Sequence, residues 1–184
     1  MTEAHARRRL YNGLGALVCA GLMAFALYAQ YGLGLAPCPL CVFQRVAVIA
    51  LGAIFLVAAL HAPGRGGAAL YGGLMIVVAA VGMAVAGRQV WLQQLPPDEV
   101  PACGPGLDYM LDVFPFTEAL AMVFQGSGEC AEVEWSLLGI SMAGWVFVML
   151  AALAAFAAWT NFRRVRRGGS RAGPATDPGG APPG

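Results

Sequence analysis

Residues 43–62 read FQRVAVIALGAIFLVAALHA, an apolar run whose only acidic or basic residues are Arg45 and His61, near its two ends, and which holds no proline. A helix needs about 20 mainly apolar residues to cross the hydrocarbon core of a bilayer. Because lipid offers no partners for open backbone, we predict that this run spans a membrane as a helix. Three similar runs lie at roughly Leu14 to Tyr31, Ala68 to Val90 and Leu137 to Thr160. The sequence therefore predicts an all-α membrane protein, a bundle of four transmembrane helices.

The composition is typical of a protein that is surrounded by membrane lipid. The chain is 59% hydrophobic and 11% charged, whereas a soluble domain carries about 25% charged residues. Its basic residues flank the apolar runs and do not form one patch, so nucleic-acid binding is not expected.

The arginines predict the orientation of the bundle. With both termini and the turn at Ala62–Gly67 inside, nine of the 11 arginines are cytoplasmic, as the positive-inside rule requires. The loops at about 32–42 and 91–136 then face outward. We expect residues 1–167 to form the membrane domain and residues 168–184 to form a disordered cytoplasmic tail. Alternatively, Arg7–Arg9 and the first run are a signal peptide cleaved near Ala24–Ala26, which would leave three spans.

Four cysteines, Cys38, Cys41, Cys103 and Cys130, fall in the two outward loops, where disulfides persist. Of three possible pairings we favour Cys38–Cys41 with Cys103–Cys130. Cys103–Cys130 would close a long loop and stabilise it. Cys38–Cys41 closes a very short loop, and such Cys-x-x-Cys pairs suit redox exchange better. The alternatives are two purely structural disulfides or a zinc site, and the loops offer no His for zinc. We expect Cys19, inside the first span, to serve packing.

Cys41 is placed to be a thiolate. It begins the second span, where unpaired N–H groups favour negative charge. Arg45 follows one turn later on the same face, either as a cation for this thiolate and a bound electron acceptor or as an interfacial side chain. In the second outward loop, Thr117 is expected to cap a short interfacial helix through Phe124.

These features together resemble the DsbB family of disulfide bond formation proteins. The resemblance runs from about Leu10 to Arg167. Its motifs are Pro37-Cys38-Pro39-Leu40-Cys41-Val42-Phe43-Gln44-Arg45 and Gly128-Glu129-Cys130-Ala131-Glu132, the latter followed by Trp135, Leu138 and Gly139.

The resemblance implies a multi-pass protein of the bacterial inner membrane that oxidises a periplasmic thioredoxin-fold partner similar to DsbA. Electrons would pass through Cys103–Cys130 and Cys38–Cys41 to a membrane quinone, ubiquinone or menaquinone, with no metal. Arg45 would lie near the quinone. Some family members carry a His near the quinone, at the outer end of the third span. Here residues 89–94 contain none, and Gln94 is the expected substitute.

Two other functions remain open at this level. A non-catalytic tetraspan protein with disulfide-linked outer loops would not need Arg45. A vitamin-K-epoxide-reductase-like enzyme would carry its Cys-x-x-Cys in a late span, whereas Cys38 and Cys41 come early.

Overall fold

The computed structural model describes residues 3–96, 98–101, 109, 112–133 and 135–169. Four of the helices in these ranges are long and apolar enough to cross a membrane. They are α1 (Glu3–Gly32), α2 (Pro39–His61), α3 (Arg65–Leu92) and α7 (Met142–Gly169). The four-helix prediction is confirmed. Each of these helices extends beyond its predicted apolar run at one end or at both ends. The reason is that hydropathy marks contact with lipid and not the limits of the helix.

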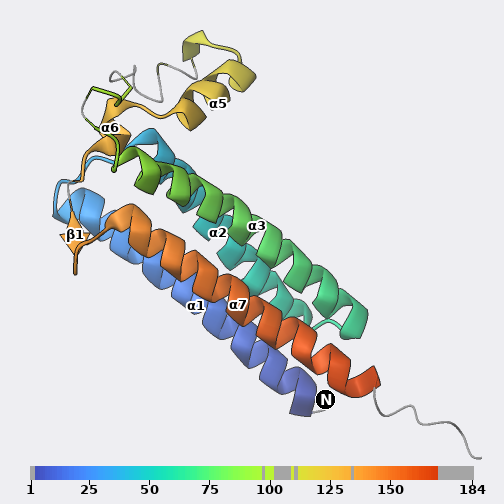
Figure 1. The fold of residues 1–184 in the computed structure, drawn as a ribbon. Coiled ribbons are helices and arrows are strands. Elements are labelled where there is room, and N and C mark those ends of the chain that lie inside the picture. Colours follow the sequence, from blue (N-terminus) through green and yellow to red (C-terminus); the bar gives the residue numbers. More distant parts are fainter. Residues whose placement is uncertain (1–2, 97, 102–108, 110–111, 134, 170–184) are drawn as a thin grey trace, which may run out of the picture.

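The four long helices lie side by side along the length of the bundle (Figure 1). α1 packs along α2, α2 along α3, and α3 along α7, while α1 and α7 touch each other less extensively. The N-terminal end of α1, the α2–α3 link and the C-terminal end of α7 share one end of the bundle (Figure 1). This alternation of direction is what the expected topology requires.

The core of the bundle is apolar and closely packed. Phe55, Leu51 and Leu150 are fully buried at its centre, and Cys19 lies beside them with 1% of its surface exposed. A Cβ atom added at Gly52 would lie 2.9 Å from the Cβ of Cys19. The small residue at position 52 therefore lets α1 approach α2, and Cys19 fills a packing position there.

The link between α2 and α3 is shorter than the predicted turn. α2 ends at His61. Its C-cap residue, Ala62, has a left-handed backbone with φ 44°, and Pro63 prevents the helix from continuing. α3 already begins at Arg65. So short a link makes the two helices antiparallel neighbours.

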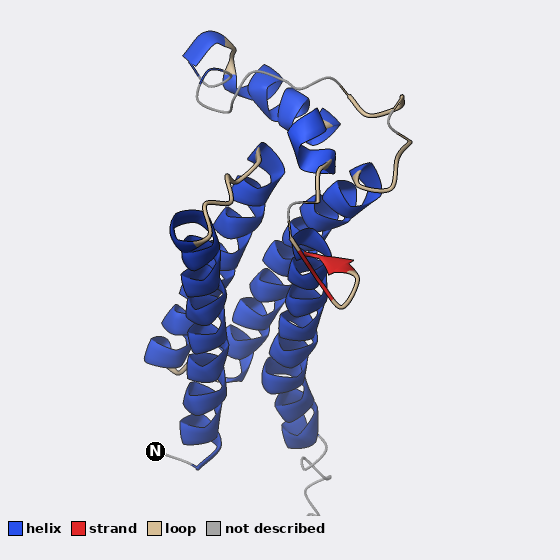
Figure 2. Ribbon diagram, turned by 90° about the vertical axis from the view of Figure 1, so that its left-hand side faces the viewer, coloured by secondary structure: helices blue, strands red, loops and turns tan. Residues whose placement is uncertain are grey.

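The fourth long helix begins later than predicted, at Met142 and not at 137. The preceding residues form a hairpin of β1 (Ser136–Leu137) and β2 (Ile140–Ser141), which pair antiparallel (Figure 2). Leu138 and Gly139 between them both have positive φ, 56° and 79°. Two left-handed residues in succession make the tight turn typical of two-residue hairpins, and this turn ends any helix at this point.

The segment between α3 and α7 contains two short helices, α5 (Phe116–Gln125) and α6 (Gly128–Ala131), at the end of the bundle opposite the termini (Figure 1). The prediction of a helix here is confirmed, but Thr117 is not its cap. The N-cap is Pro115, and no side chain caps the helix. Val123 of α5 packs with Leu92 and Cys130, which fastens this loop to the end of α3. The expected tail beyond Gly169 lies outside the described residues.

Candidate active site

Two of the predicted cysteines sit at the N-terminus of α2. Cys38 is the N-cap residue, with φ −69° and ψ 163°, and Pro39 occupies the first turn, where its missing N–H is harmless. Cys41 follows within that turn. The sulfur atoms of Cys38 and Cys41 lie 3.0 Å apart and belong to free thiols, since a disulfide would require about 2.05 Å. The structure thus brings the pair together in its reduced form, and the predicted disulfides remain predictions.

A third cysteine, Cys130, reaches the same place from α6. It is buried and is held there by α6, where its N–H donates to Ser127 O at 2.9 Å. The Cys38 side chain packs in the same cluster and lowers the pKa of Cys130 from 9.0 to about 6. Burial opposes this shift, while backbone hydrogen bonding at Leu40 and Ser127 supports it. Cys130 is therefore the more acidic thiol of the two.

Cys38 is the less acidic thiol. The neighbouring Cys130 and Cys41 raise its pKa well above the ordinary range, and burial adds to the shift. Cys38 thus lies beside two sulfurs, that of Cys41 at 3.0 Å and that of Cys130 from the segment between α3 and α7. Cys103, the expected disulfide partner of Cys130, lies outside the described residues.

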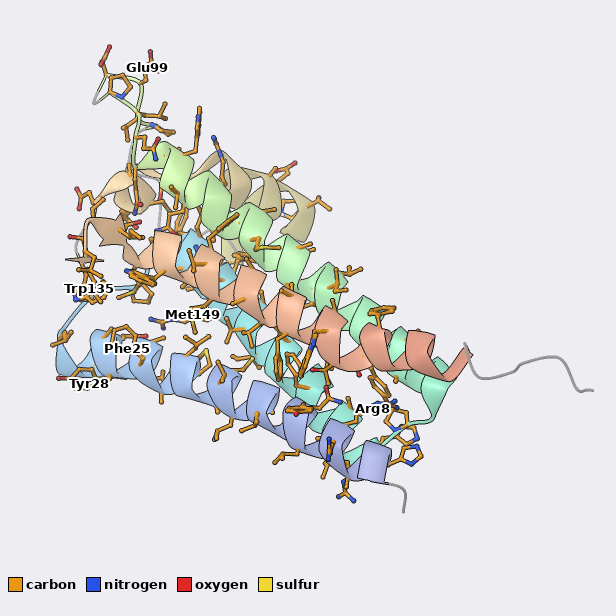
Figure 3. The ribbon with its side chains drawn as sticks, turned by 60° about the horizontal axis from the view of Figure 1, so that its bottom comes forward. Arg8, Phe25, Tyr28, Glu99, Trp135 and Met149 are labelled. Atoms are coloured by element: carbon orange, nitrogen blue, oxygen red, sulfur yellow. The ribbon has the colours of Figure 1, made fainter. Side chains whose placement is uncertain are left out.

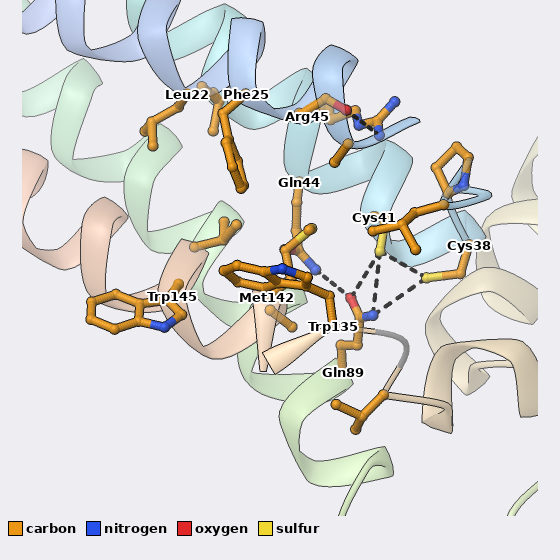
Figure 4. A pocket seen from close by; sticks show the side chains of 18 of the residues that line it. Leu22, Phe25, Cys38, Cys41, Gln44, Arg45, Gln89, Trp135, Met142 and Trp145 are labelled. Atoms are coloured by element: carbon orange, nitrogen blue, oxygen red, sulfur yellow. Dashed lines mark hydrogen bonds between the residues drawn. The ribbon is translucent and has the colours of Figure 1, made fainter. Parts of the chain in front are cut away.

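Two glutamines that the sequence reasoning did not select complete the cluster. The Gln89 side-chain nitrogen, from α3, donates to Cys38 Sγ at 3.4 Å and to Cys41 Sγ at 3.3 Å. Gln44 Nε2, from α2, donates to Gln89 Oε1 at 2.6 Å. Both glutamines are 4% exposed. Figure 4 shows the two amides and the two sulfurs joined in one network. A polar residue inside an apolar span is the sequence signal that marks such positions.

The structure places Arg45 beside the cluster but bonds it to α1. Its guanidinium donates to Gln30 Oε1 and, at 3.3 Å, to the carbonyl of Ala26. Arg45 therefore joins α2 to α1 at the level of Cys41 (Figure 4). Its predicted action as a cation for a bound acceptor is compatible with this position and remains a prediction.

Gln94, the expected substitute for a His, is exposed on the short turn after α3 and does not line the cavity described next. Gln89 and Gln93, from the same stretch, do line it. The difference arises because α3 continues to Leu92, so helical spacing turns Gln89 toward the sulfurs, and Gln94 falls beyond the helix end.

A cavity of about 440 Å³ opens beside the cluster, between α1, α2 and α7. Its walls are aromatic and apolar, and its polar groups gather at one end (Figure 4). Phe25 of α1 meets Trp135 edge-on with ring centroids 5.9 Å apart, and Trp145 Nε1 donates to the carbonyl of Leu137 at 3.1 Å. Phe25, Trp135 and Met149 lie toward one another across this space (Figure 3). The lining includes Leu22, Met23, Cys38, Cys41, Gln44, Arg45, Gln89, Met142 and Val146.

Comparison with known proteins agrees with the geometry. A model of the family described as "Disulfide bond formation protein DsbB" matches residues 8–160. The chain belongs to the DsbB family. The resemblance predicted from the cysteine motifs is thereby confirmed over nearly the whole membrane domain.

Several similar proteins carry the name "Disulfide bond formation protein B". One from Nitrosococcus oceani is 53% identical over 146 residues, which cover 79% of this chain and 86% of the relative. One from Chromobacterium violaceum is 51% identical and covers 84% and 93% of the two chains. This DsbB-family chain therefore spans nearly the full length of these relatives, and its family is one of disulfide bond formation.

Proposed function

We propose that this DsbB-family protein is a protein-disulfide:quinone oxidoreductase that reoxidises a periplasmic dithiol protein. One observation carries the proposal. Thiols from both outward loops, Cys38, Cys41 and Cys130, converge at the N-terminus of α2 beside an apolar cavity. A purely structural pair of disulfides would need neither the contact between loops nor the cavity.

The contact between Cys130 and Cys38 supports a specific order of thiol exchange. A partner thiolate attacks Cys103 in a Cys103–Cys130 disulfide, which forms a mixed disulfide and releases Cys130 as a thiolate. The Cys130 thiolate attacks Cys38 in a Cys38–Cys41 disulfide, and Cys41 leaves as a thiolate. Backbone hydrogen bonding at Leu40 and Ser127, which does not depend on the Cys38 thiol, lowers the pKa of Cys130 and favours it as leaving group and as thiolate.

The remaining exchanges balance the electrons. The second partner thiol attacks the mixed disulfide, so the partner leaves oxidised and Cys103 is released. Cys103 attacks Cys130, which restores the Cys103–Cys130 disulfide and leaves Cys38 and Cys41 reduced. Two electrons and two protons have then passed from the partner to the Cys38–Cys41 pair.

The cavity fits a membrane quinone as the final acceptor. Its volume, about 440 Å³, lies within the range of roughly 300–1,000 Å³ typical of ligand pockets. Aromatic walls suit a planar ring, and Arg45 and Cys41 lie at the polar end. When bound, a quinone supplies an acceptor for two electrons and two protons. Arg45 would hold a carbonyl oxygen, and Cys41 would be the nearest thiolate. Ubiquinone and menaquinone both satisfy this description.

The partner is inferred from the chemistry of the first step. It must present a reactive dithiol to Cys103, as a thioredoxin-fold oxidase similar to DsbA does. Cys130 and the two short helices α5 and α6 lie at the end of the bundle away from the termini, so exchange with a soluble protein takes place there (Figure 1).

An orientation follows from the arginines. Arg7–Arg9, Arg65 and Arg163–Arg167 all belong to segments at one end of the bundle. We infer that this end is cytoplasmic and that the membrane is the bacterial inner membrane. Reporter fusions after Arg65 and after Arg167 should report the cytoplasm, and a fusion at Asp108 should report the periplasm. A periplasmic signal after Arg167 would contradict the four-span topology.

The proposed activity can be tested with purified protein, a reduced thioredoxin-fold oxidase and a soluble quinone. We expect one quinone to be reduced for every two partner thiols lost, measured by quinone absorbance and thiol titration. The Cys38→Ser variant should reduce no quinone and should oxidise at most one partner per Cys103–Cys130 disulfide. Quinone reduction that continues without the partner or in Cys38→Ser would contradict the proposal.

A further inference from the structure

The Gln89 carboxamide contacts both sulfurs of the Cys-x-x-Cys pair. We propose that Gln89 is a catalytic residue that binds Cys41 as thiol and as thiolate without changing its own protonation, and that Gln44 positions it. The role of Gln89 in turnover rests on the proposed function, whereas its effect on the Cys41 sulfur can be tested separately.

The side-chain nitrogen of Gln89 is suited to two sulfurs at once. A carboxamide NH₂ carries two hydrogens, and the structure directs this nitrogen to Cys38 Sγ at 3.4 Å and to Cys41 Sγ at 3.3 Å. A thiolate can only accept hydrogen bonds. Gln89 therefore supplies what a Cys41 thiolate needs, in a place from which water is largely excluded.

The carbonyl oxygen of Gln89 can accept a hydrogen bond from Cys41 when Cys41 is a thiol. Cys41 Sγ lies 3.5 Å from Gln89 Oε1, within reach of an S–H donor. As a thiol, Cys41 can donate to this oxygen, and as a thiolate it can accept from the nitrogen of the same amide. A thiol that cycles between the two states meets a partner in each of them.

The hydrogen bond from Gln44 fixes the orientation of the Gln89 amide, so that the amide nitrogen faces the two sulfurs. Its Nε2 donates to Gln89 Oε1 at 2.6 Å, and both side chains are 4% exposed. Rotation of the Gln89 amide by 180° would bring two NH₂ groups together and turn the carbonyl away from its donor. Because buried polar groups are costly to leave unpaired, this contact selects the orientation that a thiolate requires.

The charged side chains described near Cys41 make other contacts or are exposed. The hydrogen bonds to the Cys41 sulfur therefore come from the neutral amide of Gln89, which Gln44 orients. On α2, Arg45 is bonded to Gln30 and the carbonyl of Ala26 on α1. On α3, Arg88 stacks on Trp91 at 4.3 Å. The remaining charged residues that line the cavity are Glu129 and Glu132, both exposed, and the lining residues of α7 are uncharged. Cys38 and Cys130 are the other titratable groups at the site.

The test measures Cys41 without partner or quinone, so its failure is distinct from failure of the proposed function. In a variant that retains Cys41 as its only cysteine, the rate of alkylation by a small neutral reagent is followed against pH. Loss of a hydrogen bond to a charged sulfur should reduce the thiolate about tenfold. We expect Gln89→Met to move the midpoint of the profile upward by about one pH unit.

Gln94→Met is the matched control, because it makes the same chemical change five residues later at an exposed position. Its alkylation profile should coincide with that of the parent. A shift as large as that of Gln89→Met would mean that the effect is not specific to the sulfur contact, and would overturn the proposal.

A second variant keeps the proposal testable if Gln89→Met lowers the yield of folded protein. Gln44→Met leaves Gln89 in place and removes only its orienting donor, so we expect a smaller upward shift. Gln89→His should restore an N–H donor and introduce a second inflection near the pKa of imidazole, about 6.5. Profiles of Gln89→Met or Gln44→Met that match the parent would overturn the proposal.

Discussion

Both ends of the helical bundle bury polar side chains, but they do so differently. At the thiol end, Gln44 and Gln89 bond to each other and to the sulfurs beside a cavity. At the opposite end, Asn12 is fully buried, and its two polar side-chain atoms have no hydrogen-bond partner among the described residues. Thr160 Oγ1 and Asn161 Oδ1, near the end of α7, are also buried without a hydrogen-bond partner among the described residues.

The comparison shows that burial of polar groups does not by itself identify the functional site. At this end of the bundle, Tyr11 of α1 packs on Trp159 of α7 with ring centroids 5.3 Å apart. Each unpaired buried group there costs about 1–3 kcal/mol of stability. At the thiol end the polar groups satisfy one another and face an open space. Mutual bonding together with the cavity distinguishes the reactive end, and four predictions test this distinction.

The largest expected effect is a complete block of turnover at the thiol end. Cys130→Ala leaves Cys103 without its disulfide partner, so the variant can no longer oxidise the reduced partner. When the variant is mixed with the oxidised partner, the Cys103 thiolate should attack the partner's disulfide, release one partner thiol and form a mixed disulfide at Cys103. Non-reducing gels and peptide mapping would detect it. Asn12→Leu, at the opposite end, should turn over normally and trap nothing. A covalent complex that maps to Cys38 or Cys41 would show that the order of exchange is different.

The next effect concerns the pH dependence of Cys130. Because its pKa is lowered to about 6, its reactivity should increase as the pH rises through about 6 and then level off. Cys38→Ala removes the main cause, and the pKa of Cys130 should rise toward that of free Cys, about 8.5. Alkylation of reduced Cys130 at pH 7 should then slow about thirtyfold. An unchanged rate would mean that Cys38 does not stabilise the Cys130 thiolate.

A smaller effect is expected from Arg45→Met. Removal of a charged donor from the polar end of the cavity should raise the KM for quinone about tenfold. Exchange between the partner and Cys103 takes place in the outward loops, so its rate, measured by stopped-flow without quinone, should not change. Equal losses in both reactions would indicate that Arg45 supports the fold through α1 and does not act on the acceptor.

The smallest effect is on stability, and its sign differs between the two ends. Asn12→Leu replaces an unpaired buried amide with an apolar group of similar size and should stabilise the protein by about 1 kcal/mol. Gln44→Leu breaks a bonded pair and should destabilise it by about 1–3 kcal/mol. Unfolding in detergent, followed by circular dichroism, measures both. Destabilisation by Asn12→Leu would mean that Asn12 has a partner, such as an ordered water.

Much of the fold could be predicted because apolar length alone specifies a membrane helix. The limits of the helices could not, since α1 continues through Arg7–Arg9 to Glu3 without lipid to require it. The start of α7 was misplaced because Leu138 and Gly139 adopt a left-handed turn within an apolar stretch. Hydropathy carries no information on such a turn.

The candidate site was predictable where the chain supplies local spacing. Cys38 and Cys41 share one helical turn, so their proximity follows from the sequence. The approach of Cys130 depends on how α6 folds back over α2, which no local pattern encodes. The contact of Gln89 with the sulfurs could not be predicted from local spacing because it depends on how α3 packs on α2, although an amide within an apolar span is itself a signal.

The tryptophans are distributed so that the protein contains its own optical reporter. Two of the four indoles, Trp135 and Trp145, form walls of the cavity, while Trp159 packs on Tyr11 at the far end of the bundle. A redox-active ring in the cavity would accept an electron from an excited indole at van der Waals distance and so quench its emission. In a Trp91→Phe variant, which removes the fourth indole, fluorescence of the unlabelled protein therefore separates into a component that reports occupancy of the cavity and a component from Trp159 that serves as an internal reference.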